Sequence, residues 1–175
     1  MWPQGPGEPV GLTAALFAAC PGLPDFTAVV GMTTTRTLLA AQAGNPSFLC
    51  LNGAGGAQRA VAMSGSRVIP AHVSAIPGLL RQRRIPVDLA LVRVQPTPTP
   101  GVWSLGVMVD FVHEIVEAAR VVVAEIDERM PLTRDDALID GARLAHFTTA
   151  DGAQPFLPDP VPSDIDATIA RHVAA

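Results

Sequence analysis

Two apolar runs separated by a helical pattern constrain this chain more than any other feature. Val87–Val94 is an almost unbroken aliphatic run bounded by prolines, and Val121–Ile126 is a second one. Between them, Phe111–Ala119 carries apolar residues at helical spacing. Runs of this kind suit strands that are covered on both faces, although a buried helix also fits Val87–Val94 on periodicity alone. We therefore predict a strand, a crossover helix and an adjacent parallel strand.

The segment Pro96–Asp110, between the first strand and the helix, is the first candidate for a ligand site. It is rich in glycine and proline and directly follows the predicted strand. Open parallel α/β sheets bind their ligands beyond the carboxyl ends of the strands. The loop is therefore expected to face the ligand.

Composition limits the class of protein. The chain has 175 residues, of which 49% are hydrophobic and 16% charged, enough for one domain with a buried core. A net charge of −4 argues against a nucleic-acid partner. No apolar run is long enough to span a membrane, and the first residues are polar and rich in proline. Cys20 and Cys50 lack metal-ligand spacing and are predicted to be buried thiols, which favours the cytoplasm.

Basic and histidine residues give little sign of a site. Arg81, Arg83 and Arg84 form one cluster, which is more typical of a solvated helix end than of a phosphate contact. The four histidines are scattered singly, so no metal site is predicted. His72 is interpreted as structural, since no carboxylate neighbours it in the sequence.

The rest of the chain alternates between strands and helices. A glycine-rich turn, Gln4–Pro9, precedes a predicted helix, and the glycine cluster Asn52–Gly56 is interpreted as a turn rather than a phosphate-binding loop. Ser74 and Ser163 are predicted to cap the helices that follow them. The predicted helices are Val10–Ala19, Thr35–Ala43, Gln58–Met63, Ile76–Gln82 and Asp164–Val173, and the further strands are Phe26–Val30, Phe48–Leu51 and Arg143–Thr149. Residues 151–163 hold four prolines and are predicted to be an extended linker.

Four sequence words together resemble a known family. IPAHVSAIP, IPVDLALVRV, WSLGVMVD and AEIDERMP follow one another as in the N-terminal half of the acetyl-CoA hydrolase/4-hydroxybutyrate CoA-transferase family, collinear from Gly5 to His172. The resemblance implies a three-layer α/β fold with a mainly parallel sheet, the CoA-transferase-like domain of the NagB/RpiA type. This domain is expected over residues 1–150. Residues 151–175 are then a linker and helix that lead to a second domain outside this chain.

The resemblance also implies an activity. Members of the family transfer coenzyme A between carboxylates, or hydrolyse the thioester, through an attacking glutamate. That nucleophile is expected in the absent C-terminal half, so no catalytic residue is assigned to this chain. Short-chain acyl-CoA thioesters and carboxylates are the implied substrates, with no tightly bound cofactor and no metal. A separate C-terminal CoA-transferase subunit is the expected partner, and the chain alone is expected to be inactive.

The same resemblance points to residues that line the cleft for the acyl group and pantetheine. They come from the glycine turn and from the WSLGVMVD loop: Gly5, Gly7, Glu8, Ser104, Gly106, Met108 and Asp110. Trp103 either narrows the acyl pocket or packs outside it. Glu125 ends a strand where catalysis could use it, but a structural role is favoured.

Two other functions stay open from the sequence. The chain departs from the family pattern at Ala75 and at Arg134–Ala137, which fits a non-catalytic binding or regulatory protein that has kept the half-fold. A different α/β enzyme, such as a relative of sugar-phosphate isomerases acting without CoA, would need an acid/base pair on this chain. The sequence offers no clear pair of that kind.

Overall fold

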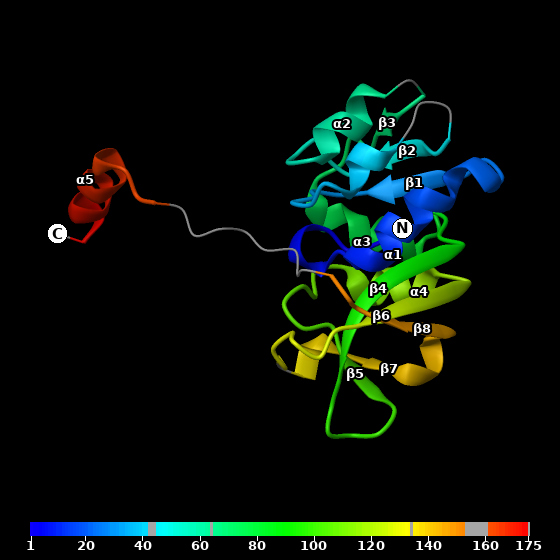
Figure 1. Cartoon of the computed structure of the whole chain (residues 1–175). Helices are drawn as coiled ribbons and strands as arrows, with labels where there is room; N and C mark the ends of the chain where they lie inside the picture. Colours follow the sequence, from blue (N-terminus) through cyan, green and yellow to red (C-terminus); the bar gives the residue numbers. More distant parts are fainter. Residues whose placement is uncertain (42–44, 64, 134, 153–160, 175) are drawn as a thin grey trace.

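Parallel strands form the centre of the fold. The computed structural model describes residues 1–41, 45–63, 65–133, 135–152 and 161–174 (Figure 1). One group of strands has the order β1-β2-β3, and a second has the order β7-β5-β4-β6-β8. The strands are β1 (Thr27–Val30), β2 (Ser47–Cys50), β3 (Arg67–Val68), β4 (Leu89–Pro96), β5 (Val102–Ser104), β6 (Val121–Ile126), β7 (Leu138–Asp140) and β8 (His146–Thr149). All pairs are parallel except β4–β5 and β5–β7.

The predicted strand–helix–strand unit is confirmed. β4 and β6 are adjacent and parallel, in register from Leu89 opposite Val121 to Val94 opposite Ile126. Helix α4 (Val112–Ala118) lies between them in the chain, and its Val112, Ile115 and Val116 are buried. The apolar runs are continuous because both faces of this part of the sheet are covered.

Residues 1–5 join the two groups of strands. The amino group of Met1 donates a hydrogen bond of 2.8 Å to Leu89 O, and Leu91 N donates one of 3.0 Å to Met1 O. On the other side, Gly5 N donates a hydrogen bond of 2.7 Å to Met32 O, just beyond β1. The N-terminal residues therefore lie between β4 and β1, near the centre of the body in Figure 1.

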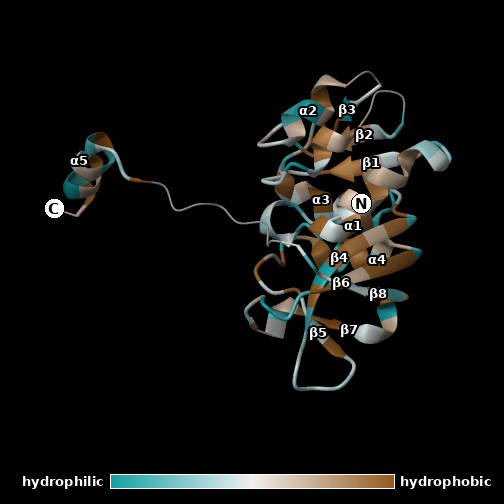
Figure 2. Ribbon diagram, viewed as in Figure 1, coloured by the Kyte–Doolittle hydropathy of each residue, from teal (hydrophilic) through white to brown (hydrophobic). Residues whose placement is uncertain are grey.

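Two apolar clusters cover the opposite faces of this sheet. Alternate residues of β4 and β6 divide between them: Ala90 and Val122 belong to one cluster, while Leu91 and Val123 belong to the other. The first cluster includes helices α3 (Ile76–Arg81) and α4, and the second includes α1 (Val10–Ala19) and α2 (Ala57–Ala62). Figure 2 shows much of β1, β2, β4 and β6 in brown, the colour of hydrophobic residues. The predicted three-layer α/β architecture is confirmed.

Several local predictions need correction. The loop 96–110 contains β5, which folds back antiparallel onto Gln95 and Pro96 of β4. The helix predicted over 35–43 is a 3-10 turn, Thr37–Ala40, while residues 42–44 lie outside the described residues. The strand predicted over 143–149 begins only at His146, because a 3-10 turn, Gly141–Arg143, precedes it.

The predicted cap of α3 is also wrong. Ser74 lies in a 3-10 turn, Val73–Ala75, which adjoins the start of α3. The His72 imidazole caps that turn by accepting from Ser74 N, and its Nδ1 lies 2.8 Å from Ser74 Oγ. The structural interpretation of His72 agrees with this contact.

The C-terminal helix is set apart from the sheet. Helix α5 (Asp164–Val173) begins at a capping box in which Ser163 and Asp166 bond each other's backbone N–H groups, so this predicted cap is confirmed. Residues 161–174 are all exposed, and Figure 1 shows α5 away from the body. Of the predicted linker, 153–160 lie outside the described residues.

Cys20 and Cys50 are buried free thiols. In the part of the chain that the structure describes, no helix is long and apolar enough to cross a membrane.

Candidate functional site

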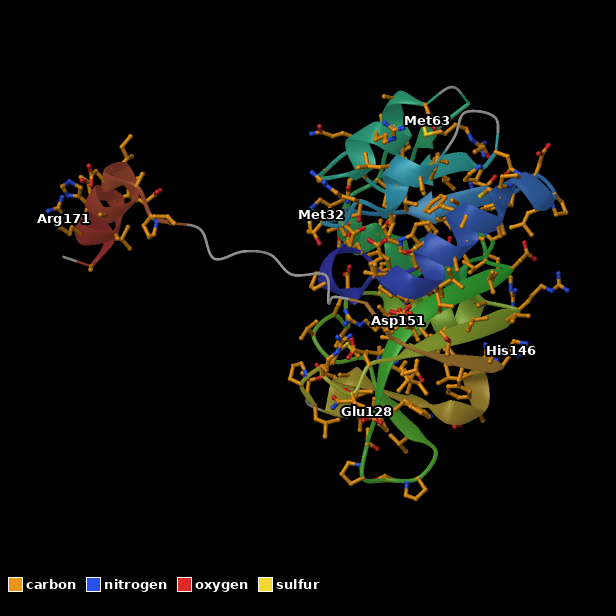
Figure 3. All side chains as sticks on the ribbon, viewed as in Figure 1. Met32, Met63, Glu128, His146, Asp151 and Arg171 are labelled. Carbon is orange, nitrogen blue, oxygen red and sulfur yellow. The ribbon has the colours of Figure 1, made fainter. Side chains whose placement is uncertain are left out.

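The candidate site lies at the C-terminal edge of the parallel strands. Met32, Glu128 and Asp151 follow the ends of β1, β6 and β8, and His146 begins β8. In Figure 3 the first three lie to the left of His146, which separates the two edges of the sheet. The glycine turn and the loop after β5 both reach the edge marked by Met32: Gly5 N donates to Met32 O, and Gln4 bonds both Met32 N and Asp110.

The glycine turn packs directly on Met108. Residues Gly5–Gly7 form a 3-10 turn in which Gly5 has a φ of +56°. A Cβ added at Gly7 would lie 2.8 Å from Met108 Cβ, and one added at Gly5 would lie 3.4 Å from Met108 Cε. Gly7 is needed because no side chain fits between the turn and Met108. Two segments that the sequence separates by about a hundred residues thus meet here.

Asp110 joins the same contact through Gln4. Gln4 Nε2 donates a hydrogen bond of 2.7 Å to Asp110 Oδ2, while Gln4 Oε1 accepts one of 3.1 Å from Met32 N. Asp110 has a positive φ of 36°, a conformation that is uncommon outside glycine. Gln4, which sequence reasoning did not single out, therefore links β1, the glycine turn and the loop after β5.

Ser104 and Gly106 shape the loop from inside. Ser104 is fully buried, and its Oγ accepts a hydrogen bond of 3.1 Å from Gly106 N. Gly106 has a φ of +64° and packs on Met130, whose Sδ would lie 3.0 Å from an added Cβ. Thr133 Oγ1 donates to Gly106 O at 2.8 Å. These contacts hold the loop. Ser104 and Gly106 are buried, whereas Val107 is exposed and Met108 is partly exposed.

The Glu8 carboxylate is enclosed by a cluster of threonines. Its carboxylate accepts from Thr13 Oγ1 at 3.0 Å, from Thr33 Oγ1 at 2.6 Å, from Thr35 Oγ1 at 2.8 Å and from Thr37 Oγ1. Only 1% of Glu8 is exposed. Four hydroxyl donors satisfy the buried carboxylate. Glu8 fixes the glycine turn to the segment after β1.

The sequence did not point to the threonine cluster, although a weak signal was present. Thr33, Thr35 and Thr37 alternate at every second residue, the spacing that places side chains of an extended chain on one side. Such alternation has no specific partner until the fold brings Glu8 opposite.

Glu125 is also held inside the protein. Its Oε2 accepts a hydrogen bond of 2.8 Å from Leu12 N, in the first turn of α1, where free N–H groups favour an anion. Glu125 is 2% exposed, and burial raises its pKa. The carboxylate therefore anchors α1 to β6, in agreement with a structural role.

A buried ion pair lies beside it. Arg93 Nη2 bonds Asp127 Oδ2, and Arg129 Nε bonds Asp127 Oδ1 at 2.8 Å. Although burial acts to raise it, the pKa of Asp127 is held well below its usual range by hydrogen bonds from Arg129 and Arg93. Arg93 and Asp127 are almost fully buried. This pair fixes the C-terminal ends of β4 and β6 against each other.

Trp103 packs on the outside of the loop. Its ring lies 5.2 Å from that of Phe147 on β8, which is half exposed, and it also contacts Gly141. Of the two interpretations from the sequence, this contact agrees with the one in which Trp103 packs outside the acyl pocket.

Among the described residues, no group of three histidine, cysteine or acidic side chains is placed to hold a metal ion.

The comparisons agree with this architecture. The fold is similar to that of a solved 4-hydroxybutyrate CoA-transferase from Porphyromonas gingivalis, with a TM-score of 0.64 and 24% identity over 86% of this chain and 34% of that one. RipA from Yersinia pestis aligns with a TM-score of 0.81 and 20% identity over 99% of this chain and 43% of that one. The structure is thus an α/β domain of the CoA-transferase type.

The family follows from the sequence match. Residues 58–161 match the acetyl-CoA hydrolase/transferase N-terminal domain, and the chain belongs to that family. It is 30% identical over 122 residues to a 4-hydroxybutyrate coenzyme A transferase from Clostridium kluyveri, and 34% identical over 101 residues to a succinyl-CoA:acetate/propanoyl-CoA:succinate CoA transferase from Fasciola hepatica. The matches cover 69% and 58% of this chain but only 28% and 21% of those proteins.

Proposed function

We propose that this chain is the N-terminal part of a CoA-transferase or acyl-CoA hydrolase that acts on short-chain acyl-CoA thioesters, as in acetate metabolism. Residues 1–150 form the domain that lines one wall of the acyl and pantetheine cleft. Residues 151–175 lead to a C-terminal subunit or domain that carries the glutamate nucleophile and makes the enzyme a heteromer. The two buried free thiols support a cytoplasmic setting.

The observation that carries the proposal is the close packing of the glycine turn on Met108 at the C-terminal edge of the sheet. Ligands of parallel α/β sheets bind at this edge. Gly7 leaves no room for a side chain on the Met108 side, and Gly5 has a positive φ that favours glycine, so the turn lies close against Met108. Such a wall suits a thin substrate like a pantetheine arm, which a second wall would have to enclose.

The environment of the carboxylates supports placing the nucleophile elsewhere. Nucleophilic attack on a thioester carbonyl needs a carboxylate that reaches the substrate. Glu8 is enclosed by threonine hydroxyls, and Glu125 is bonded to the start of α1. Both oxygens of Glu8 and the buried Oε2 of Glu125 are already engaged. We infer that the domain positions the substrate and that the partner supplies the acyl-enzyme.

Reconstitution tests the proposal. The purified chain is mixed with a C-terminal CoA-transferase subunit, and exchange of CoA from acetyl-CoA to 4-hydroxybutyrate or succinate is followed by chromatography. We expect turnover from the mixture and none from either part alone. Trapping with borohydride and mass spectrometry should then label a glutamate of the partner subunit. A labelled glutamate on this chain would overturn the assignment.

A matched pair of glycine variants tests the wall itself. Gly7→Ala should displace Met108 and reduce the reconstituted rate about tenfold or more, since small misplacements at a site are costly. Gly22→Ala, where the added Cβ has nothing within 4 Å, should leave the rate unchanged. Thermal unfolding of both variants separates misfolding from a local effect. Equal rates in the two variants would show that the glycine turn does not contribute to the active site.

A further inference from the structure

Asp110 combines an exposed side chain with a strained backbone. Its φ is +36°, in the left-handed region that residues with a side chain seldom occupy. Strain of this kind persists only where surrounding contacts hold it, and it is common at ligand-binding positions. The exposed side chain fills no place in the core, so burial does not explain the conformation. A contact that holds Asp110 in place does.

The Gln4 carboxamide supplies that contact and fixes the direction of the carboxylate. A backbone N–H can only donate, so the oxygen of the amide must face Met32 N, from which it accepts a hydrogen bond of 3.1 Å. The Gln4 nitrogen then faces Asp110 Oδ2 at 2.7 Å. Gly31 makes room for this arrangement, because a Cβ there would lie 2.6 Å from Gln4 Oε1. Asp110 is therefore the acceptor in this pair.

The Asp110 carboxylate keeps most of its capacity to accept hydrogen bonds. An ionised carboxylate has about four lone-pair sites on its two oxygens. Within the described residues, Gln4 Nε2 is the only group that donates to it. None of the ion pairs in this part of the chain includes it. Its Oδ1 can therefore accept from a ligand that carries an N–H or O–H group.

Two methionine side chains make the surface beside Asp110 apolar. The Cε atoms of Met108 and Met32 lie 3.4 and 3.5 Å from the position of a Cβ added at Gly5, so both methyl groups flank the glycine turn. Both methionines are partly exposed. Gln4, which precedes Gly5, brings Asp110 to the same place. A ligand at this surface would meet methyl and thioether groups and one anionic acceptor.

We propose that Asp110 accepts a hydrogen bond from an amide N–H of the pantetheine arm, and that Gln4 is the positioning residue that holds Asp110 for it. This inference rests on the proposed function, in which the same edge lines the cleft for acyl-CoA. The pantetheine arm is a thin chain of methylene and amide groups, which suits an apolar surface with one acceptor. A carboxylate or a phosphate group would be repelled by Asp110. The carboxylate substrate and the phosphates of CoA are therefore expected to bind elsewhere in the cleft.

Analogues of the thioester test the hydrogen bond in the reconstituted mixture. Acetyl-CoA is compared with two analogues, each with a different amide N–H of the pantetheine arm replaced by an ester oxygen. We expect one analogue to raise KM about tenfold or more, as for a lost hydrogen bond to a charged group, with a much smaller change in kcat. Equal KM for acetyl-CoA and both analogues would overturn the contact.

Asp110→Asn identifies the acceptor. While the Asn oxygen faces Gln4 Nε2, its NH₂ group faces the ligand and cannot accept a hydrogen bond. The variant should raise KM for acetyl-CoA about tenfold or more and should no longer distinguish the analogues from acetyl-CoA. Asp88→Asn, at the opposite edge of the sheet, is the matched control and should behave like wild type. Discrimination by Asp110→Asn as strong as that by wild type would overturn the assignment.

Two variants of Gln4 test its positioning role on the chain alone. Gln4→Met removes both hydrogen bonds, so the Met32 amide should exchange with deuterium about tenfold faster or more. Gln4→Glu keeps an oxygen for Met32 N but sets a second carboxylate against Asp110, so faster exchange should be confined to residues 107–111. Unchanged exchange of Met32 in Gln4→Met, or of residues 107–111 in Gln4→Glu, would overturn the positioning role.

The same variants in the reconstituted mixture separate this inference from the proposed function. Gln4→Glu should raise KM as Asp110→Asn does, whereas Gln58→Glu, at an exposed position, should not. An unchanged KM in Gln4→Glu would overturn the positioning role. Calorimetry of acetyl-CoA and the two analogues measures binding without turnover. A mixture that discriminates the analogues in binding but has no turnover would support the contact and count against the proposed activity, while the absence of binding would overturn both.

Discussion

Leu12 and Glu125 are joined by a hydrogen bond of 2.8 Å that connects the first turn of α1 to the end of β6. The two residues are 113 positions apart in the chain. Gly11 permits the contact, because a Cβ at this position would lie 2.6 Å from Glu125 Oε2. The helix can approach the carboxylate only while residue 11 has no side chain.

Gly11→Ala should therefore destabilise the protein. An exposed helical glycine replaced by alanine normally gains about 1 kcal/mol, but here the carboxylate must move and lose its bond to Leu12. We expect a net loss of about 1–2 kcal/mol in the free energy of unfolding, measured by urea denaturation. Gly78→Ala in α3, where the Cβ has nothing within 4 Å, should stabilise by up to about 1 kcal/mol. A stabilising Gly11→Ala would contradict the close approach.

Asp127→Asn should destabilise the protein because Arg93 would keep a buried charge without its carboxylate. Breaking a buried pair costs about 3–5 kcal/mol. The lowered pKa of Asp127 stabilises the folded state above the usual carboxyl range, and this contribution is lost as pH falls. The difference between wild type and variant should thus shrink below about pH 4. Asp88→Asn, at an exposed pair with Arg120, should change little.

Glu8→Gln tests the threonine cluster. The amide supplies two donors where the hydroxyls of Thr33, Thr35 and Thr37 now donate to a carboxylate, so the network must rearrange. We expect a loss of about 1–3 kcal/mol in the free energy of unfolding. Glu128→Gln, at an exposed position, is the matched control and should be neutral. Equal stabilities in thermal and urea unfolding would show that the cluster contributes nothing.

The amino group of Met1 should make stability depend on pH between about 5 and 8. Its pKa is about 5 in the folded protein against 8.0 as the ordinary value, so the unfolded chain binds more protons in this range. The free energy of unfolding should rise with pH by up to about 4 kcal/mol, at about 1.4 kcal/mol per pKa unit. Acetylation of Met1 removes the group and should remove this rise. Parallel pH profiles of acetylated and free chains would contradict a buried amine.

The periodicity of apolar residues predicted those elements whose residue pattern follows directly from burial in the core. β4, α4 and β6 carry apolar residues on every covered side, and their pattern is visible in the sequence. The 3-10 turn Thr37–Ala40 was predicted as a longer helix because its apolar spacing resembles one. Tertiary hydrogen bonds from Thr35 and Thr37 to Glu8 hold this segment in another form. Contacts between residues so far apart leave no local signal.

The residues of the candidate site likewise fall into those that the sequence predicted and those that it did not. Family resemblance brought together Gly5, Gly7 and Met108, which the structure places in contact. Gln4 was not predicted, because a single glutamine between proline and glycine has no pattern until Met32 and Asp110 lie on either side of it. The inward direction of Glu8 was also hidden, since the sequence cannot show which way a turn presents its carboxylate.

The position of Met1 between β1 and β4 affects how the sheet can form during synthesis. Its partner Leu89 leaves the ribosome 88 residues later, and β6 and β8 follow later still. Until β4 is available, the N-terminal residues have no partner on the β4 side. Pairing between residues so far apart in the sequence is slow. The first 80 residues therefore emerge with an unpaired strand edge, to which a chaperone could bind. Closure of the row around Met1 should come late, after the ribosome has released β4.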